Sequence, residues 1–107
     1  MTHYAWIIDT DHLVDGKTIS RSEVGVTGPR SAPIDLLKRL QKGAGARFEL
    51  FDDDGELCYT GRVIERDPKT SLVTAEPVTE EGCFGPLDDF GRPSAGCTTI
   101  KINGKAI

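Results

Sequence analysis

The chain has 107 residues, a net charge of −4 at pH 7, 37% hydrophobic residues and 28% charged residues. These values are typical of one globular domain, residues 1–107, and they exclude a disordered chain or a second core. No apolar run is long enough to cross a membrane, and the N-terminal sequence MTHYAWIIDTDH lacks the pattern of an export signal. Three widely separated cysteines fit reduced thiols, so we expect a cytoplasmic protein.

Residues 4–9 are predicted to form the first strand, with apolar side chains on both faces. Because a strand of this kind is covered on both sides, we expect it to be central in its sheet. Its alternating residues are Tyr4, Trp6 and Ile8 on one face, and Ala5 and Ile7 on the other.

A turn at Asp15-Gly16 and a short strand at residues 23–27, which ends at Gly28-Pro29, follow in chain order. Residues 33–42 then predict a helix, with Ser31 as N-cap and Gly43 after its last turn. Its expected buried stripe is Ile34, Leu37 and Leu40, helped by Leu36.

Residues 46–63, ARFELFDDDGELCYTGRV, predict one β-hairpin around Asp54-Gly55. In the register that this turn sets, Arg47 lies opposite Arg62, where like charges are unfavourable. The opposite face of the hairpin carries six residues, namely Ala46, Phe48, Leu50, Tyr59, Gly61 and Val63.

A turn at residues 67–69 and a strand near residues 71–76 are expected to complete an antiparallel meander, and residues 98–102 form a final strand. Five to six short strands and one α-helix predict an α+β fold. The sheet is expected to be strongly curved and mostly antiparallel, or a partly open β-barrel, with the helix covering one face or end. The predicted core is Trp6, Ile8, Leu37, Leu40, Phe48, Leu50, Tyr59, Val63, Ile100 and Ile102.

Residues 77–96, PVTEEGCFGPLDDFGRPSAG, contain four glycines and three prolines and are predicted to form a long loop. Ordered loops of this length are often functional. We hypothesise a partner-binding patch within residues 81–96, because apolar anchors ringed by charges are typical of recognition sites. Alternatively, Phe84 and Phe90 plug the sheet and leave only the charged residues outside. The candidate contacts are Phe84, Leu87, Asp88, Asp89, Phe90 and Arg92.

The sequence predicts no catalytic, cofactor or metal site. Residues 50–55 resemble the start of a calcium-binding loop. The match is rejected because Leu50 and Gly61 occupy the positions of the first and last ligands. Whether Cys83 and Cys97 approach each other stays open. The zinc candidates His3, His12, Cys58, Cys83 and Cys97 have no close ligand pairs. The enzymatic alternative is a metal-dependent or acid–base hydrolase that uses Asp9, Asp11, His12 or a loop cysteine.

Charge is unevenly distributed along the chain, with basic residues in 30–47 and acidic residues in 76–90. The negative net charge and the few aromatic candidates make a nucleic-acid-binding module an alternative of low weight. A further alternative is an acidic protein that occupies a nucleic-acid-binding partner. The basic residues concerned are Arg30, Lys38, Arg39, Lys42 and Arg47.

The segments DDDGELCYTGR and PLDDFGRPSAGCT resemble small uncharacterised proteins of bacterial and phage origin. The resemblance implies no activity and transfers no site residues. From the residues themselves, we expect a small non-enzymatic binding or accessory protein that acts through contact with another protein. Nothing in the sequence indicates its oligomeric state.

Overall fold

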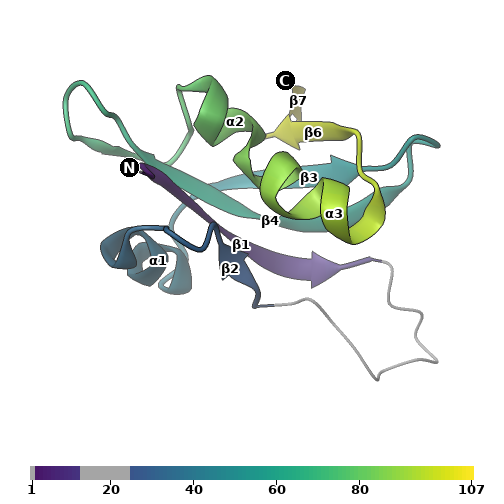
Figure 1. Ribbon diagram of the computed structural model, residues 1–107, viewed down its shortest axis with the longest axis horizontal. Helices are drawn as coiled ribbons and strands as arrows, with labels where there is room; N and C mark the ends of the chain where they lie inside the picture. The colour runs from purple at the N-terminus through teal and green to yellow at the C-terminus, as the bar shows by residue number, and fades with distance from the viewer. Residues whose placement is uncertain (1, 13–24) are drawn as a thin grey trace.

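The computed structural model describes residues 2–12 and 25–107. Within these residues, seven strands form one antiparallel sheet in the order β2-β1-β4-β3-β6-β7, with β5 also paired to β4 (Figure 1). The strands are β1 (Tyr4–Asp11), β2 (Thr27–Gly28), β3 (Ala46–Phe51), β4 (Leu57–Arg66), β5 (Val73–Thr74), β6 (Thr99–Ile102) and β7 (Lys105–Ala106). The helical segments are α1 (Ile34–Gln41), α2 (Glu80–Pro86), the π-helix η1 (Leu87–Gly91) and the single turn α3 (Arg92–Ala95).

The α+β fold class and the antiparallel sheet are confirmed, but the expected strong curvature is wrong. The sheet is neither closed nor strongly curled. Helix α1 covers one face, and α2, η1 and α3 cover the other (Figure 1). A sheet that packs against helices on both faces buries its apolar side chains without closing on itself.

Strand β1 is central between β2 and β4, as its pattern predicts. Trp6 and Ile8 join the core cluster beneath the η1 layer, whereas Ala5 packs with Leu36 and Leu40 of α1. The predicted turn at Asp15-Gly16 and the first residues of the predicted second strand lie outside the described residues.

The hairpin register is confirmed from Ala46 opposite Val63 to Leu50 opposite Tyr59, and it then shifts by one residue, so that Phe51 lies opposite Leu57. Arg47 does face Arg62, and the structure separates the two charges by giving each guanidinium a different partner. Arg62 forms two hydrogen bonds of 2.8 and 2.9 Å with Asp9, and it donates to the Leu40 carbonyl at 2.6 Å. Strand β4 therefore fixes the C-terminal end of α1 through this arginine.

The predicted meander is wrong, because β5 pairs with the same edge of β4 as β3 does, further along the strand. Glu65 pairs with Tyr4 of β1 on one edge and with Thr74 of β5 on the other. The Ala46 amide donates to the Ala75 carbonyl at 3.1 Å, which places the start of β3 beside the end of β5.

The predicted helix is present as α1, but its buried stripe is rotated. Leu36 and Leu40 are fully buried, Leu37 is half-buried, and Ile34 is 70% exposed. The position before the helix is Pro33 without a side-chain cap, and the Ser31 hydroxyl instead contacts Thr2. The i, i+4 pair of Leu36 and Leu40 meets Ala5 and Ile64, so this pair sets which face packs on the sheet.

Residues 77–96 do not form the long loop that their glycines and prolines suggest, and the prediction of a single helix is therefore wrong. Thr79 caps α2 by accepting a hydrogen bond of 3.1 Å from the Gly82 amide. Gly82 and Pro86 are buried, so these residues serve close packing rather than turns. The apolar residues of the segment recur at helical spacing and face the sheet.

The final strand is confirmed as β6, and a short return strand, β7, follows the Asn103-Gly104 turn. Of the predicted core, every residue is buried except the half-buried Leu37. No helix in the described ranges is long and apolar enough to span a membrane. The core also holds Ala5, Leu36, Ala46, Cys58, Ile64, Leu87, Phe90 and Cys97.

Leu40→Ala and Ile34→Ala test the observed orientation of α1. Removing the fully buried Leu40 side chain should lower the free energy of unfolding by about 2–5 kcal/mol, because a cavity remains. Removing the exposed Ile34 side chain should change it by no more than about 0.5 kcal/mol. Urea denaturation measures both values, and a loss for Ile34→Ala as large as that for Leu40→Ala would restore the stripe expected from the sequence.

Candidate functional site

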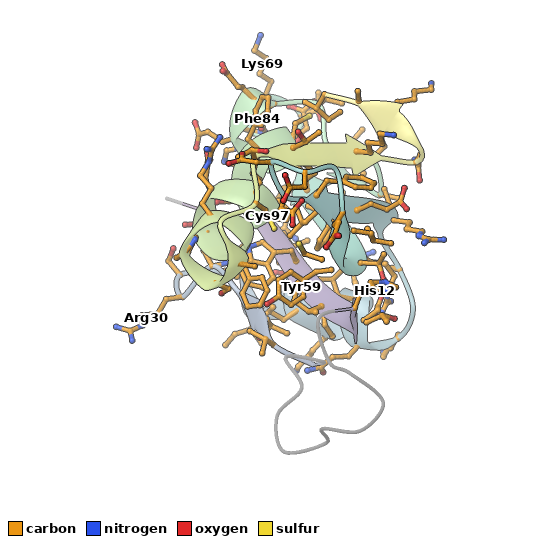
Figure 2. All side chains as sticks on the ribbon, turned by 90° about the vertical axis from the view of Figure 1, so that its right-hand side faces the viewer. His12, Arg30, Tyr59, Lys69, Phe84 and Cys97 are labelled. Carbon is orange, nitrogen blue, oxygen red and sulfur yellow. The ribbon has the colours of Figure 1, made fainter. Side chains whose placement is uncertain are left out.

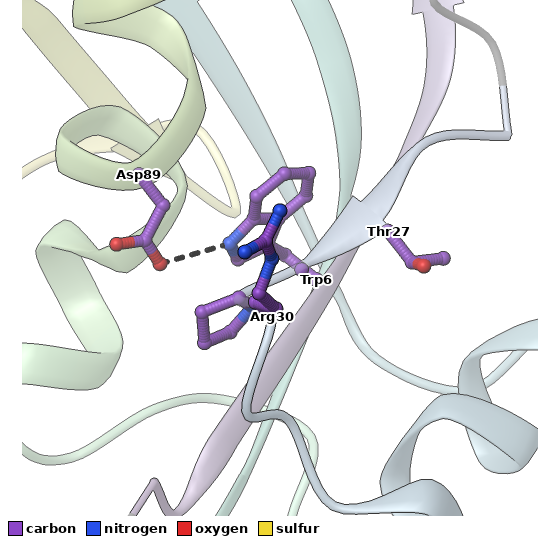
Figure 3. Close-up of a pocket in the computed structure, with 6 residues that line it drawn as sticks. Trp6, Thr27, Arg30 and Asp89 are labelled. Atoms are coloured by element: carbon purple, nitrogen blue, oxygen red, sulfur yellow. Dashed lines mark hydrogen bonds between the residues drawn. The ribbon is translucent and has the colours of Figure 1, made fainter.

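A surface pocket of about 440 Å³ lies where η1 meets the edge of the sheet formed by β1 and β2 (Figure 3). Asp89 comes from η1 and Trp6 from β1, and the other lining residues belong to β2 and the turn after it. We call this the Asp89 pocket. Its lining residues are Trp6, Thr27, Gly28, Pro29, Arg30 and Asp89.

Two donors on β1 hold the Asp89 carboxylate in place. The Tyr4 hydroxyl donates to Asp89 Oδ2 at 2.6 Å, and the Trp6 indole nitrogen donates to the same oxygen at 3.1 Å. Trp6 is only 3% exposed, so packing also fixes the orientation of its ring. The exposed carboxylate is therefore presented to solvent in one defined position.

The sequence of η1 explains why Asp89 points outward at this place. Leu87 and Phe90 are buried, whereas Asp88 and Asp89 are exposed. The Phe90 ring lies 5.3 Å from the Trp6 ring and 4.8 Å from the Tyr59 ring, measured between centroids. This aromatic contact anchors η1 to the sheet, and π-helical turns of this kind are frequent at functional sites.

Gly28 allows β2 to approach the indole closely. It pairs with Trp6 in the sheet, and a Cβ atom at this position would overlap the Trp6 ring. Any larger residue would push β2 away from β1 and open the floor of the pocket. Glycine is therefore required here by close approach and not by a special backbone angle.

The electrostatic environment of the pocket is acidic on the η1 side. Burial raises the pKa of Tyr4 above its ordinary value, and the hydrogen bond and charge of Asp89 raise it further, with smaller contributions from Glu81 and Asp88. Asp88 is paired with Arg92, whose Nε lies 3.0 Å from its carboxylate. Three carboxylates raise the pKa of Tyr4. Of these, Asp89 and Glu81 form no ion pair with another described residue.

The structure divides the predicted partner-binding residues into two groups. Leu87 and Phe90 are core residues, 1% and 6% exposed, and Phe84 is half-buried against the same cluster. Asp88, Asp89 and Arg92 are exposed, which is the arrangement that the plug alternative describes. Sequence reasoning assigned Trp6 to the core and did not connect Tyr4, Pro29 or Arg30 with residues 81–96.

The cysteines are buried or half-buried thiols, and Cys83 of α2 and Cys97 after α3 belong to different contacts. Cys83 Sγ donates to the Pro77 carbonyl at 3.5 Å, whereas the partner of Cys97 is Cys58. Burial, together with the hydrogen bond that the Cys97 thiol donates to Cys58, raises the pKa of Cys97 to about 12. A thiol with such a pKa stays protonated at neutral pH and is a poor nucleophile. Cys97 and Tyr59 lie inside the protein beside α3 (Figure 2).

The residues considered for metal binding or hydrolysis have other contacts. In residues 2–12 and 25–107, no group of three or more His, Cys, Asp and Glu side chains is arranged to hold a metal ion. Asp52 accepts hydrogen bonds from the Asp54 and Glu56 amides and shapes the hairpin turn. Asp9 is paired with Arg62, His12 Nε2 lies 3.5 Å from Thr60 Oγ1, and the Asp11 side chain lies outside the described part.

His3, Thr79 and Glu65 meet in the structure, which sequence spacing did not indicate. His3 Nε2 lies 3.0 Å from Thr79 Oγ1 and 3.2 Å from Glu65 Oε2. In a hydrolytic triad, the two imidazole nitrogens contact the nucleophile and the acid separately. Here one nitrogen contacts both groups, and Glu65 is fully buried, so the cluster is a structural anchor.

A second pocket, of about 460 Å³, lies between the N-terminus, the start of α1 and the β4–β5 turn. Its Arg66 is already paired with Asp35, whose pKa that guanidinium lowers. The Asp89 pocket differs because its two charged residues, Asp89 and Arg30, form no ion pair with each other in the structure. The lining residues of the second pocket are Thr2, His3, Ser31, Pro33, Arg66, Asp67, Pro68 and Ser71.

Comparison with known proteins does not assign the chain to a family. No family model matches the sequence, and neither the curated proteins nor the solved structures contain a match. The candidate site therefore rests on its own geometry.

Alkaline titration tests the contact between Tyr4 and Asp89. The chain has two tyrosines, so Tyr59→Phe leaves Tyr4 as the single phenol. In this background, Asp89→Asn should lower the pKa of Tyr4 toward its ordinary value of 10.0, although burial keeps it somewhat raised. Ultraviolet absorbance of the tyrosinate measures the pKa. An unchanged pKa in the Asp89→Asn variant would contradict the contact.

The raised pKa of Tyr4 in the folded protein also predicts how stability depends on pH. The folded protein keeps Tyr4 protonated, whereas the unfolded chain loses this proton near the ordinary pKa of tyrosine. The contribution of Tyr4 to stability is therefore present below pH 10.0 and is lost as the pH rises toward the folded-state pKa.

Proposed function

We propose that the protein is a non-enzymatic binding module that docks another protein on the surface around the Asp89 pocket. The observation that carries this proposal is the exposed Asp89 carboxylate, fixed by Tyr4 and Trp6 at the side of a surface pocket. A charged group that is already immobilised loses little conformational entropy when a partner binds.

The composition of the pocket supports a protein partner. Buried Trp6 and half-buried Pro29 provide an apolar floor, and exposed Asp89 and Arg30 provide charged groups at its sides. Protein interfaces combine apolar contact of this kind with a polar rim. Arg30 extends from the body of the protein, where it is accessible to a partner (Figure 2).

The alternatives have less support from the same residues. A hydrolase based on Asp9 would use a carboxylate whose two oxygens both accept hydrogen bonds from Arg62. A nucleic-acid backbone would meet Glu81, Asp88 and Asp89 on the η1 side of the pocket, where its phosphates are repelled.

Affinity capture with matched variants tests the proposed function. Asp89→Asn removes one charge and keeps an oxygen that accepts from Tyr4 and Trp6, whereas Glu56→Gln removes one exposed charge on the β3–β4 turn. From a lysate of the source cells, a specific protein should be recovered with the wild type and with Glu56→Gln, and its recovery should fall with Asp89→Asn.

Quantitative mass spectrometry measures the recovery, and direct binding to the purified partner must reproduce the order of the three proteins. Thermal denaturation of Asp89→Asn checks that the variant is folded. Equal binding by the wild type and a folded Asp89→Asn variant would contradict the placement of the docking surface.

A further inference from the structure

The two oxygens of the Asp89 carboxylate differ in their surroundings. Both donors of β1, the Tyr4 hydroxyl and the Trp6 indole, converge on Oδ2. In the described part of the chain, the hydrogen bonds recorded for this carboxylate leave Oδ1 without a donor, and the residue is exposed. Figure 3 shows Asp89 on the opposite side of the pocket from Thr27, with its Oδ2 directed at Trp6. With respect to the described residues, Oδ1 is thus an acceptor that a group from outside can use.

The charges around this oxygen favour a positively charged group. The carboxylates of Asp89, Glu81 and Asp88, from η1 and the preceding α2, all raise the pKa of the Tyr4 hydroxyl, so this side of the pocket is acidic. Arg92 neutralises Asp88, and Arg30 contributes the positive charge of the pocket itself. An incoming cation therefore meets the Asp89 carboxylate, which has no ion pair among the described residues, and the negative charge of Glu81 adds to its attraction.

The form of the pocket indicates what carries this cation. The pocket is open to solvent and lined on one side by Trp6 and Pro29, which suits the methylene groups of a long side chain. Lysine and arginine bury such methylene groups against apolar surfaces while their charged ends contact a carboxylate.

We infer that the Asp89 pocket receives a lysine or arginine side chain of the partner protein, whose cation contacts Asp89 Oδ1. This inference rests on the proposed protein-binding function and names the chemistry of the contact. Tyr4 and Trp6 are positioning residues, because their hydrogen bonds to Oδ2 hold the carboxylate at the side of the pocket.

The single tryptophan provides a direct probe of this contact. Trp6 is the only tryptophan of the chain, so its indole N–H gives one resonance in a proton–nitrogen correlation spectrum. Because this N–H donates to Asp89, a cation that binds the carboxylate changes the chemical shift of the resonance. The probes are the capped amides of arginine and lysine, with the capped amide of citrulline as a neutral analogue of arginine.

At low ionic strength, the arginine or lysine probe should cause a saturable shift, and the citrulline probe should cause none. Asp89→Asn should weaken the binding by about fivefold or more, the effect of losing one charge-assisted contact. Arg30→Gln should strengthen it, because a like charge is removed from the pocket. High salt should abolish the shift, since it screens charges on an exposed surface.

The outcomes separate the two proposals. A response to arginine alone or to lysine alone supports the inference and identifies the preferred cation. No response to either probe, or a response to capped glutamate instead, overturns the inference. If partner capture still depends on Asp89 in that case, the proposed function stands and only the cation contact fails. If capture does not depend on Asp89 either, both proposals fail.

Discussion

The buried Glu65 carboxyl group ties the helical layer to the sheet, and the position of Asp89 in the candidate site depends on this contact. Glu65 lies on β4 with no exposed surface, and it accepts hydrogen bonds from the Val78 and Thr79 amides at 2.7 and 3.2 Å and from the Thr79 hydroxyl. His3 Nε2 lies 3.2 Å from Oε2, the oxygen that accepts from the Thr79 hydroxyl. A buried carboxyl group is costly without such partners, so this arrangement specifies one position for the start of α2.

The consequences extend from Glu65 to the pocket through a continuous helical segment. Thr79 caps α2, and a Cβ atom at Gly82 would overlap the Glu65 carboxyl group, so a glycine is needed where the helix approaches the strand. From this fixed start, α2 leads without interruption into η1, where Phe90 packs against Trp6 and Asp89 reaches the donors on β1. The charged group of the site is therefore positioned by a carboxyl group on β4 and by an aromatic contact to β1.

The parts of the fold that follow local rules were predictable. The hairpin register follows from side-chain alternation around Asp54-Gly55, and the central place of β1 follows from its two apolar faces. The helical character of residues 77–96 was not, because Gly82, Gly85 and Pro86 usually indicate loops, and here they serve contacts with distant strands. The candidate site was predictable only in Asp89. Its partners Tyr4 and Trp6 are more than eighty positions away, and nothing in a single sequence signals that pairing.

Hydrogen exchange of a Glu65→Gln variant tests most directly whether this carboxyl group positions the site. Glutamine keeps an oxygen for the Val78 and Thr79 amides, but its NH2 group replaces Oε2, which accepts from the Thr79 hydroxyl and lies against His3, so the contact at the cap of α2 is disrupted. Amide exchange measured by mass spectrometry should accelerate in residues 80–91, while β3 and β4 keep their protection. Unchanged protection of residues 80–91, or an equal loss of protection in β3 and β4, would contradict the role of Glu65 as the local anchor of the site.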